Sequence, residues 1–90
     1  MISCLYKKIF LKDLSEVHPD HRGNIEKLVF EEIPALSSVF KAFDIKKMKG
    51  YDTYYRIRKG QYRIGIKIED SQTVVFYRVK NRSDIYKVFP

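Results

Sequence analysis

The stretch YYRIRKGQYRIGIKIED, residues 54–70, alternates apolar and polar side chains on either side of Lys59-Gly60. Alternation with a period of two is typical of a β-strand, and a glycine-containing pair between two such runs is typical of a hairpin turn. We therefore predict strands over Tyr54 to Arg58 and over Gln61 to Ile68. A third run, Thr73 to Val79, follows a polar turn and completes a three-stranded antiparallel meander.

The two turns also predict how the strands pair. With Lys59-Gly60 as a two-residue loop, Arg56 lies opposite Arg63, and the second turn places Arg63 opposite Arg78. Because side chains alternate along a strand, one face gathers the apolar residues Tyr55, Ile57, Tyr62, Ile64, Ile66, Ile68, Val75, Tyr77 and Val79. The other face gathers the basic residues Arg56, Arg58, Arg63, Lys67 and Arg78, which Lys80 and Arg82 continue past the strand end.

The N-terminal half predicts a short strand over Ser3 to Tyr6 and then two helices. Apolar residues recur at helical spacing from Phe10 to Val17, and the pair His18-Pro19 ends this helix. Asp20 is expected to cap a second amphipathic helix, which runs to the neighbourhood of Pro34. We expect the two helices to form a hairpin that covers the apolar face of the meander.

These elements predict an α+β fold. It has an N-terminal strand, a helical hairpin packed on one face of a mainly antiparallel twisted sheet, and a C-terminal three-stranded meander. Ser37 or Ser38 is expected to cap a short turn around Val39 to Phe43, and residues 46–50 are interpreted as a basic connector. Ninety residues without an internal repeat or linker predict a single domain, residues 1–90.

The positive charge is concentrated in the second half of the chain. The net charge is +7, and it divides into −1 up to Phe40 and +8 after it. An excess confined to one part of a small domain favours a polyanionic partner or an acidic protein partner. Nucleic acid is favoured over a membrane surface because the basic residues lie in predicted strands and not along a helical stripe. The alternative is a basic surface that is merely solvated.

Several classes of protein are excluded by what the sequence lacks. No apolar run approaches the roughly 20 residues of a membrane span, and the first residues lack the apolar segment of a secretory signal. With a single cysteine, Cys4, no internal disulfide forms, and a cytoplasmic location is expected. His18 and His21 have no further ligands at metal-site spacing, and no glycine-rich phosphate loop is present. We therefore expect neither a metal nor a cofactor.

The basic face predicts a site for phosphate groups. Like charges opposite one another destabilise a sheet, and no carboxylate of this face lies between the arginines of the first two strands. A guanidinium group matches the geometry of two phosphate oxygens better than an ammonium group does. Tyr54 and Tyr86 are the aromatic residues best placed to stack on bases. The alternative is that the long arginine side chains only cover the sheet.

Three segments of the sequence together resemble the RelE toxins of the RelE/ParE superfamily. They are Tyr54 to Arg58, YYRIR; Gln61 to Ile64, within GQYRI; and Arg82 to Tyr86, RSDIY. The order of a strand, a helical hairpin, a meander and a short terminal element matches the same family. The resemblance extends over the whole chain and implies a RelE-like fold.

The resemblance implies a toxin of a type II toxin–antitoxin system that acts as a ribosome-dependent mRNA endoribonuclease. In that family the 2′-hydroxyl group of a nucleotide attacks the adjacent phosphodiester, which leaves a cyclic phosphate and a 5′-hydroxyl. The implied partners are a RelB-like antitoxin, in a hetero-oligomer, and mRNA in the ribosomal A site together with 16S and 23S ribosomal RNA. No cofactor is implied. The alternative within the superfamily is a non-nuclease, ParE-like inhibitor of DNA gyrase, and a third possibility is an RNA-binding module without activity.

Site residues follow from matching the family's motifs to this sequence. The catalytic residues that the resemblance implies are Arg56, Arg58, Arg63, Arg82 and Tyr86. The predicted RNA-binding residues are Tyr54, Lys67, Arg78, Lys80 and Asn81. Asn81 stands where many relatives have histidine, and arginine is a poor proton acceptor. The identity of the general base is therefore left open, among another base, an assisting ribosomal group and an unassisted hydroxyl.

Overall fold

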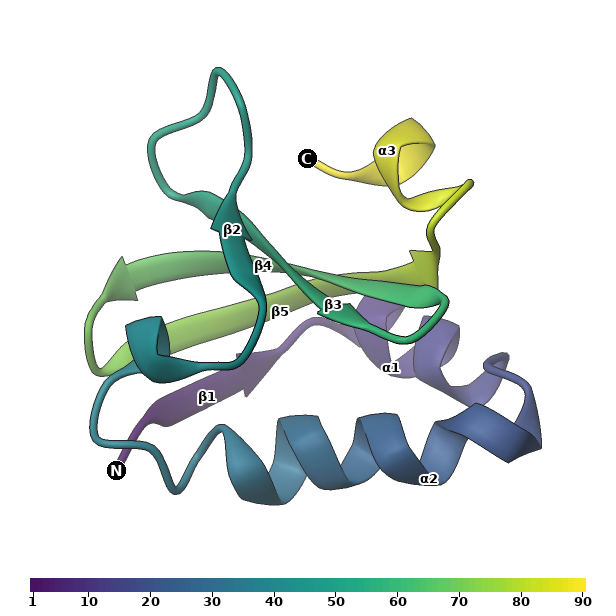
Figure 1. Ribbon diagram of the computed structural model, residues 1–90, viewed down its shortest axis with the longest axis horizontal. Helices are drawn as coiled ribbons and strands as arrows, with labels where there is room; N and C mark the ends of the chain where they lie inside the picture. The colour runs from purple at the N-terminus through teal and green to yellow at the C-terminus, as the bar shows by residue number, and fades with distance from the viewer.

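The computed structural model describes all residues, 1–90, and contains one five-stranded sheet in the order β1-β5-β4-β3-β2 (Figure 1). The strands are β1 Ser3–Tyr6, β2 Ile45–Lys47, β3 Tyr54–Lys59, β4 Tyr62–Asp70 and β5 Thr73–Asn81. Strand β1 is parallel to β5, and the other neighbours are antiparallel. The predicted α+β class with a mainly antiparallel sheet is confirmed.

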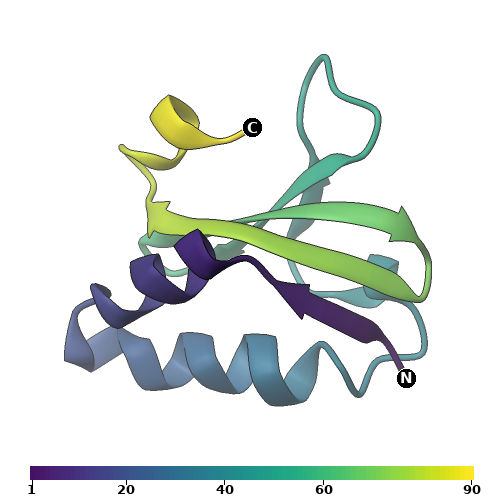
Figure 2. The same ribbon diagram turned by 180° about the vertical axis from the view of Figure 1, so that it is seen from behind.

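Two helices lie against one face of the sheet, as predicted (Figure 2). Helix α1 is Lys8–Ser15, and α2 is Pro19–Lys27, which continues into a π-helical turn, η1, Leu28–Glu32. The expected cap of α2 was wrong: the Nδ1 atom of His18 accepts a hydrogen bond from the Asp20 N–H group, 3.2 Å away, so His18 is the cap. Pro19 occupies the first helical position, so the cap is the residue before it and not the residue after it. No helix of the structure has the length and apolar character needed to span a bilayer.

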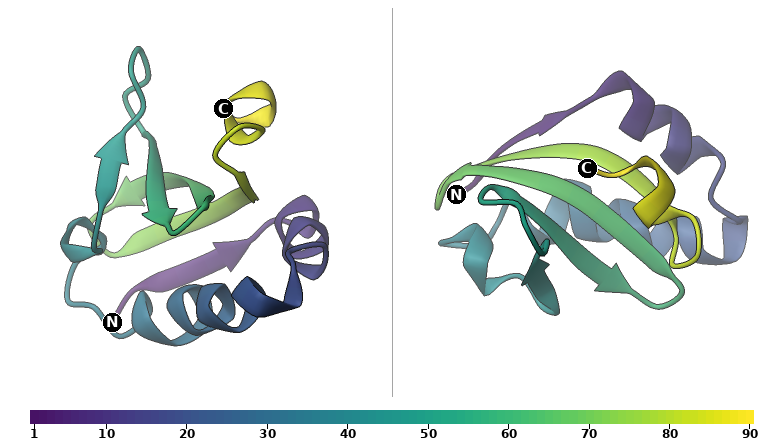
Figure 3. Two further views of the ribbon diagram at one scale, coloured as in Figure 1. Left: turned by 45° about the vertical axis from the view of Figure 1, so that its right-hand side comes forward. Right: turned by 90° about the horizontal axis from the view of Figure 1, so that it is seen from above.

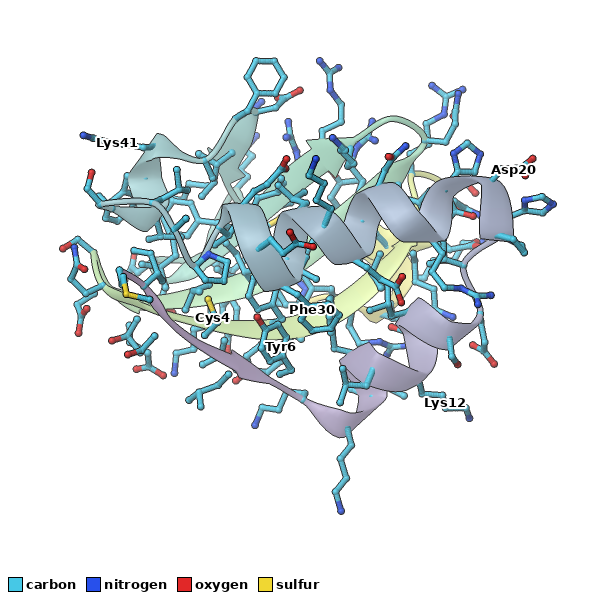
Figure 4. All side chains as sticks on the ribbon, turned by 90° about the horizontal axis from the view of Figure 1, so that it is seen from below. Cys4, Tyr6, Lys12, Asp20, Phe30 and Lys41 are labelled. Carbon is cyan, nitrogen blue, oxygen red and sulfur yellow. The ribbon has the colours of Figure 1, made fainter.

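The main core lies between the helices and the sheet. Its largest fully buried members come from α1, from α2, η1 and the residue after it, from the short turn at Val39 and from the three long strands: Phe10, Ile25, Val29, Ile33, Val39, Ile57, Ile64, Ile66, Val74, Phe76 and Val79. Tyr6 joins β1 to this core, since its ring stacks on Phe76 at 4.9 Å and lies beside Phe30 (Figure 4). Its hydroxyl group donates to the carbonyl of Val29 at 2.6 Å, and burial raises the pKa of this phenol.

The pairing of β3 with β4 differs from the prediction by two residues. Gly60 has φ of 58° and is the first residue of the loop, so Lys59 belongs to β3 and pairs with Tyr62. Arg58 therefore lies opposite Arg63, and Arg56 lies opposite Gly65. The expected Arg56–Arg63 pair was wrong because the glycine begins the turn and does not end it. A shift of two residues preserves the face of every side chain.

Strand β5 contains a bulge that the alternation pattern does not reveal. Ile66 pairs with Phe76, whereas the preceding Gly65 pairs with Arg78, so Tyr77 has no direct partner. The expected Arg63–Arg78 pair was wrong because the second turn is centred on Ser71-Gln72, with Asp70 opposite Thr73, so that Arg63 pairs with Lys80. Before the bulge the core residues are Val74 and Phe76, so the placement of Val75 and Tyr77 on the helix-covered face was also wrong.

The segment interpreted as a basic connector contains a fourth antiparallel strand, β2, at the edge of the sheet. Its Lys46 and Lys47 are exposed. Charged residues on an edge strand discourage pairing with other chains. Because a run of lysines is also common in loops, the sequence did not indicate a strand here. The short 3₁₀ turn Val39–Lys41 before it, η2, is capped by the Ser38 hydroxyl as predicted, 3.3 Å from the Phe40 nitrogen.

A second, smaller apolar cluster lies on the sheet face opposite the helices, where the loop after β2 and the terminal segment rise from the sheet (Figure 3). Its buried members are Met48, Ile85 and Phe89, against which Tyr54 and Tyr77 pack. Ile85 is the first residue of the short helix α3, Ile85–Val88, and Phe89 directly follows that helix. The Phe89 ring lies over Gly65 so closely that a Cβ atom there would be 2.5 Å from it. The cluster thus anchors the terminal segment to the centre of the sheet.

Gly65→Ala is expected to destabilise the protein by about 1 to 3 kcal/mol, the usual cost of overpacking, because Phe89 must move. The matched control is Gly23→Ala, which lies within α2 and meets nothing within 4 Å. The control should raise stability by about 0.5 to 1 kcal/mol, since alanine favours helix. Urea unfolding of both variants measures the difference; equal stabilities would contradict the anchoring of Phe89.

Candidate nucleic-acid interface

An open hollow of about 490 Å³ lies at the turn between β3 and β4. Its lining residues are Phe43, Asp44, Arg58, Lys59, Gly60, Gln61, Arg63 and Arg82. It contains three of the predicted catalytic arginines, one from β3, one from β4 and one from the segment after β5. The N–H group of Arg82 donates to the carbonyl of Gln61 at 2.8 Å, which ties that segment to the turn. We call this site the arginine hollow.

Arg63 and Arg82 have no ion-pair partner within the chain. The Nη1 atom of Arg63 donates to the carbonyls of Gly60 and Tyr62, at 3.0 and 3.1 Å, so the main chain of the turn holds the guanidinium group. Carbonyl oxygens orient the group without neutralising it. The arginine hollow therefore offers positive charge to an incoming anion.

Arg58 and Arg56 both contact Asp44. Arg58 donates through Nε to the carboxylate, and Arg56 Nη1 lies 3.5 Å from it. Partial desolvation raises the pKa of Asp44, but the hydrogen bond and charge of Arg58, and then those of Arg56, outweigh this effect and lower it. The Arg58 side chain is 55% exposed and that of Arg56 only 16%. Arg58 is thus the more accessible of the two guanidinium groups.

A neighbouring hollow of about 310 Å³ contains the other two predicted catalytic residues, Arg56 and Tyr86. Its remaining lining residues are Lys46, Lys47, Met48 and Lys49. Tyr86 projects from α3 and is 57% exposed, while its neighbour Ile85 is fully buried. The anchored terminal helix therefore presents an aromatic ring beside a group of lysines.

Arg78 and Lys80 lie elsewhere, because a buried aspartate of α1 holds them. Asp13, whose side chain is 2% exposed, accepts from Arg78 Nε at 2.6 Å and from Arg78 Nη2 at 3.2 Å. It also accepts from the Val79 N–H group at 3.2 Å, and Lys80 Nζ lies 3.4 Å from it. The hydrogen bond to Asp13 raises the pKa of Arg78. The predicted RNA-binding role of these two residues remains a prediction, and their contacts favour a structural role.

The other predicted RNA-binding residues have local contacts. Tyr54 is half-buried and meets Tyr77 and Phe89 edge-on, at ring distances of 5.9 and 5.6 Å. Lys67 lies opposite Tyr54 on β4, with its Nζ atom 3.9 Å from Glu69. The Asn81 side-chain oxygen accepts from the N–H groups of Ser83 and Asp84, at 3.0 and 3.1 Å, and so forms the turn that leads to α3. None of these three lines the arginine hollow.

The arginine hollow contains no histidine, and Asp44 is its only carboxylate. His18 and His21 lie at the junction of α1 and α2, where His21 packs against Tyr62 at a ring distance of 5.5 Å. No group of three or more potential metal ligands occurs in the structure. Sequence reasoning missed Asp44 and Gln61 as lining residues. The Gly60-Gln61 turn is a local signal for Gln61, but nothing local indicates Asp44.

The arginines of the hollow come from three segments and can contact a phosphate group from several sides.

Proteins of known identity share the fold of this chain. No family model matches the chain. It is 47% identical over 87 residues to Toxin RelE3 of Methanocaldococcus jannaschii, covering 96% of this chain and 97% of the relative. The toxin in the crystal structure of a RelB-RelE antitoxin-toxin complex from Methanococcus jannaschii is 46% identical, with a TM-score of 0.77, over 96% of this chain and 99% of that chain.

A more distant match shows the fold alone. It is the RelBE2 toxin-antitoxin complex of Mycobacterium tuberculosis, with 20% identity and a TM-score of 0.71 over 90% of this chain and 98% of that chain. The identity to RelE3 extends over nearly the full length of both chains. The chain therefore belongs to the RelE family of toxins.

Proposed function

We propose that this toxin cleaves mRNA on the ribosome, by attack of a 2′-hydroxyl group on the adjacent phosphodiester. The convergence of Arg58, Arg63 and Arg82 on one open hollow is the observation that carries the proposal. The three side chains come from separate segments, and the pairing of β3 with β4 and the Arg82–Gln61 hydrogen bond bring them together. A surface that only served solubility would not need such convergence.

The proposed chemistry uses the charge of these arginines. Attack of the 2′-oxygen forms a phosphorane with more negative charge than the phosphodiester, and the bond to the 5′-oxygen of the next nucleotide then breaks. The products are a 2′,3′-cyclic phosphate and a 5′-hydroxyl. Guanidinium groups that are already oriented stabilise the extra charge without reorganisation. Main-chain carbonyls give Arg63 this orientation, and Asp44 gives it to Arg58.

Proton transfer is the step for which the arginine hollow offers no suitable group. Arginine stays protonated, and the lowered pKa of Asp44 makes its carboxylate a weak base. Groups outside this chain, or solvent, therefore have to remove the proton of the 2′-hydroxyl and to protonate the leaving 5′-oxygen. This shortage supports a dependence on the ribosome, which supplies further functional groups and positions the mRNA.

Tyr86 and the neighbouring lysines extend the proposed site. An exposed aromatic ring beside cations suits a base stacked on the ring with its phosphates near Lys46 and Lys49. We assign Tyr86 to the orientation of the substrate. Arg56, which is mostly covered, contributes charge to this second hollow and contact to Asp44.

The proposed partner is a RelB-like antitoxin. The related structure from Methanococcus jannaschii is a RelB-RelE complex, and it is 46% identical to this chain. An acidic or amphipathic segment suits the positive charge of the arginine hollow. A segment of this kind would exclude RNA from the same surface, which is how an antitoxin can neutralise a nuclease.

The proposal predicts new 5′ ends on mRNA that is being translated. Purified toxin is added to a translation reaction and, separately, to the same transcript without ribosomes, and primer extension maps the ends. We expect ends with free 5′-hydroxyl groups only in the translated sample. Absence of new ends in both samples, together with inhibited supercoiling by gyrase, would favour the ParE-like alternative. Binding to RNA without any cleavage would instead indicate an RNA-binding module.

A further inference from the structure

Asp44, directly before β2, has an unusual backbone conformation. Its φ of 59° makes it the one non-glycine residue of the chain with positive φ. Such a conformation costs free energy in a residue with a side chain and persists where surrounding contacts hold it. Residues of this kind are concentrated at functional sites. The contacts that hold Asp44 are therefore informative.

Those contacts are to Arg56 and Arg58 and involve both the main chain and the side chain of Asp44. Its carbonyl oxygen accepts from Arg56 Nη1 at 2.9 Å and from the Arg58 N–H group at 3.2 Å. Its carboxylate accepts from Arg58 Nε and lies 3.5 Å from Arg56 Nη1. One residue with a left-handed backbone conformation thus holds the guanidinium groups of Arg56 and Arg58, which are two residues apart on β3.

The way in which Arg58 is held leaves its two terminal nitrogens free to bind an anion. The hydrogen bond to Asp44 uses Nε, and Nη1 and Nη2 have no partner in the chain. Arg58 also lies directly opposite Arg63 on β4, where like charges repel. A carboxylate next to Arg58 offsets this repulsion and keeps the side chain from turning into solvent.

We propose that Asp44 is a positioning residue, which holds Arg58 by Nε so that its terminal nitrogens face the arginine hollow and bind the phosphate of the substrate. This inference rests on the proposed function and adds a residue to it. Two other roles are inconsistent with the contacts. A general base would need a carboxylate of higher pKa than that of Asp44. If the role of Asp44 were to block the site until RNA binds, its carboxylate would contact the terminal nitrogens of Arg58, but these nitrogens are free.

The test compares Asp44→Gly and Asp44→Asn with matched changes at Asp52. Glycine and asparagine both tolerate positive φ, so the turn before β2 is retained. Asp52 is fully exposed, and its carboxylate contacts only Lys47 at 3.8 Å. Asp52→Gly and Asp52→Asn therefore remove the same charge from the basic half of the chain without touching an arginine. Thermal unfolding establishes that all four variants are folded.

We expect Asp44→Gly to lower kcat on ribosome-bound mRNA by about tenfold to a hundredfold, as for other misplaced catalytic groups. Asp44→Asn keeps an oxygen acceptor for Arg58 and should fall between this variant and wild type. The KM of Asp44→Gly should stay the same or decrease, as in Asp52→Gly, because both changes make the protein more positive. A kcat equal to that of Asp52→Gly, or higher than that of wild type, would overturn the inference.

A second measurement separates this inference from the nuclease itself. The Arg58 Nε–H resonance should be protected from exchange with solvent in wild type and unprotected in Asp44→Gly, and the Arg82 resonance should be unprotected in both. An unprotected Arg58 resonance in wild type would overturn the positioning role even if cleavage occurs. Wild-type protein that cleaves no translated mRNA would overturn the proposed function, whatever the resonances show.

Discussion

Arg63→Ala is expected to reduce cleavage of translated mRNA by about a hundredfold to a thousandfold, the loss seen when one preorganised donor is removed from an enzyme that stabilises an oxyanion. Arg63 has no counter-ion, and the carbonyls of Gly60 and Tyr62 fix its orientation, so no neighbouring side chain replaces it. Growth arrest on expression should disappear with the activity. Primer extension over a time course in a translation reaction measures the loss.

Two variants make the result specific. Arg63→Lys keeps the charge but loses the planar fork, and we expect most of the activity to be lost with it. Arg22 is the matched control because it is an α2 arginine whose guanidinium group also donates to a main-chain carbonyl, that of Val17, at 3.2 and 2.9 Å. Arg22→Ala should leave cleavage unchanged. Full activity of folded Arg63→Ala would remove the basis of the proposed site.

Asp13→Ala is expected to lower the free energy of unfolding by about 3 to 5 kcal/mol, the usual cost of removing one partner from a buried ion pair. The change leaves Arg78 without its counter-ion and the Val79 N–H group without an acceptor. For a domain of this size each kcal/mol lowers Tm by about 4 to 8 °C. Thermal unfolding should therefore show a decrease of more than about 10 °C.

The control is Asp20→Ala, since Asp20 is exposed and its carboxylate contacts only His18 at 3.6 Å. That variant should remain within about 0.5 kcal/mol of wild type. Asp13→Leu combined with Arg78→Met removes both charges and should recover much of the loss, because an apolar pair of similar size replaces a buried ion pair well. Equal free energies of unfolding for Asp13→Ala and Asp20→Ala would show that the contacts of Asp13 contribute little to the stability of the protein.

Alternation and helical spacing sufficed to predict the class of fold, because these signals come from side chains near one another in sequence. The error at the Gly60 turn changed which arginines face each other but moved no side chain to the other face. The bulge in β5 had a larger effect. Residues 74–77 are all apolar, so neither face of the strand is marked by polar residues, and only packing against α1 and the terminal segment decides which of them are buried.

The candidate site was predictable only in part, for a related reason. Arg58, Arg63 and Arg82 lie in segments whose pairing follows from the meander, so their proximity is expected. The two carboxylates that form ion pairs with the strand arginines are remote from those arginines in sequence. Asp13 is 65 residues from Arg78, and Asp44 is 14 residues from Arg58. No local pattern reveals that Arg63 and Arg82 have no ion-pair partner in the fold whereas Arg78 is paired with a buried aspartate.

The parallel pairing of β1 with β5 has a consequence for how the protein is made. Residues 3–6 pair with residues 73–76, which are synthesised 70 residues later. Contacts so distant in sequence form slowly and late. The five-stranded sheet is therefore complete only after β5 has been synthesised, and the arginine hollow, which includes Arg82, forms no earlier. On the proposed function, a chain that is still being synthesised lacks the complete site for RNA.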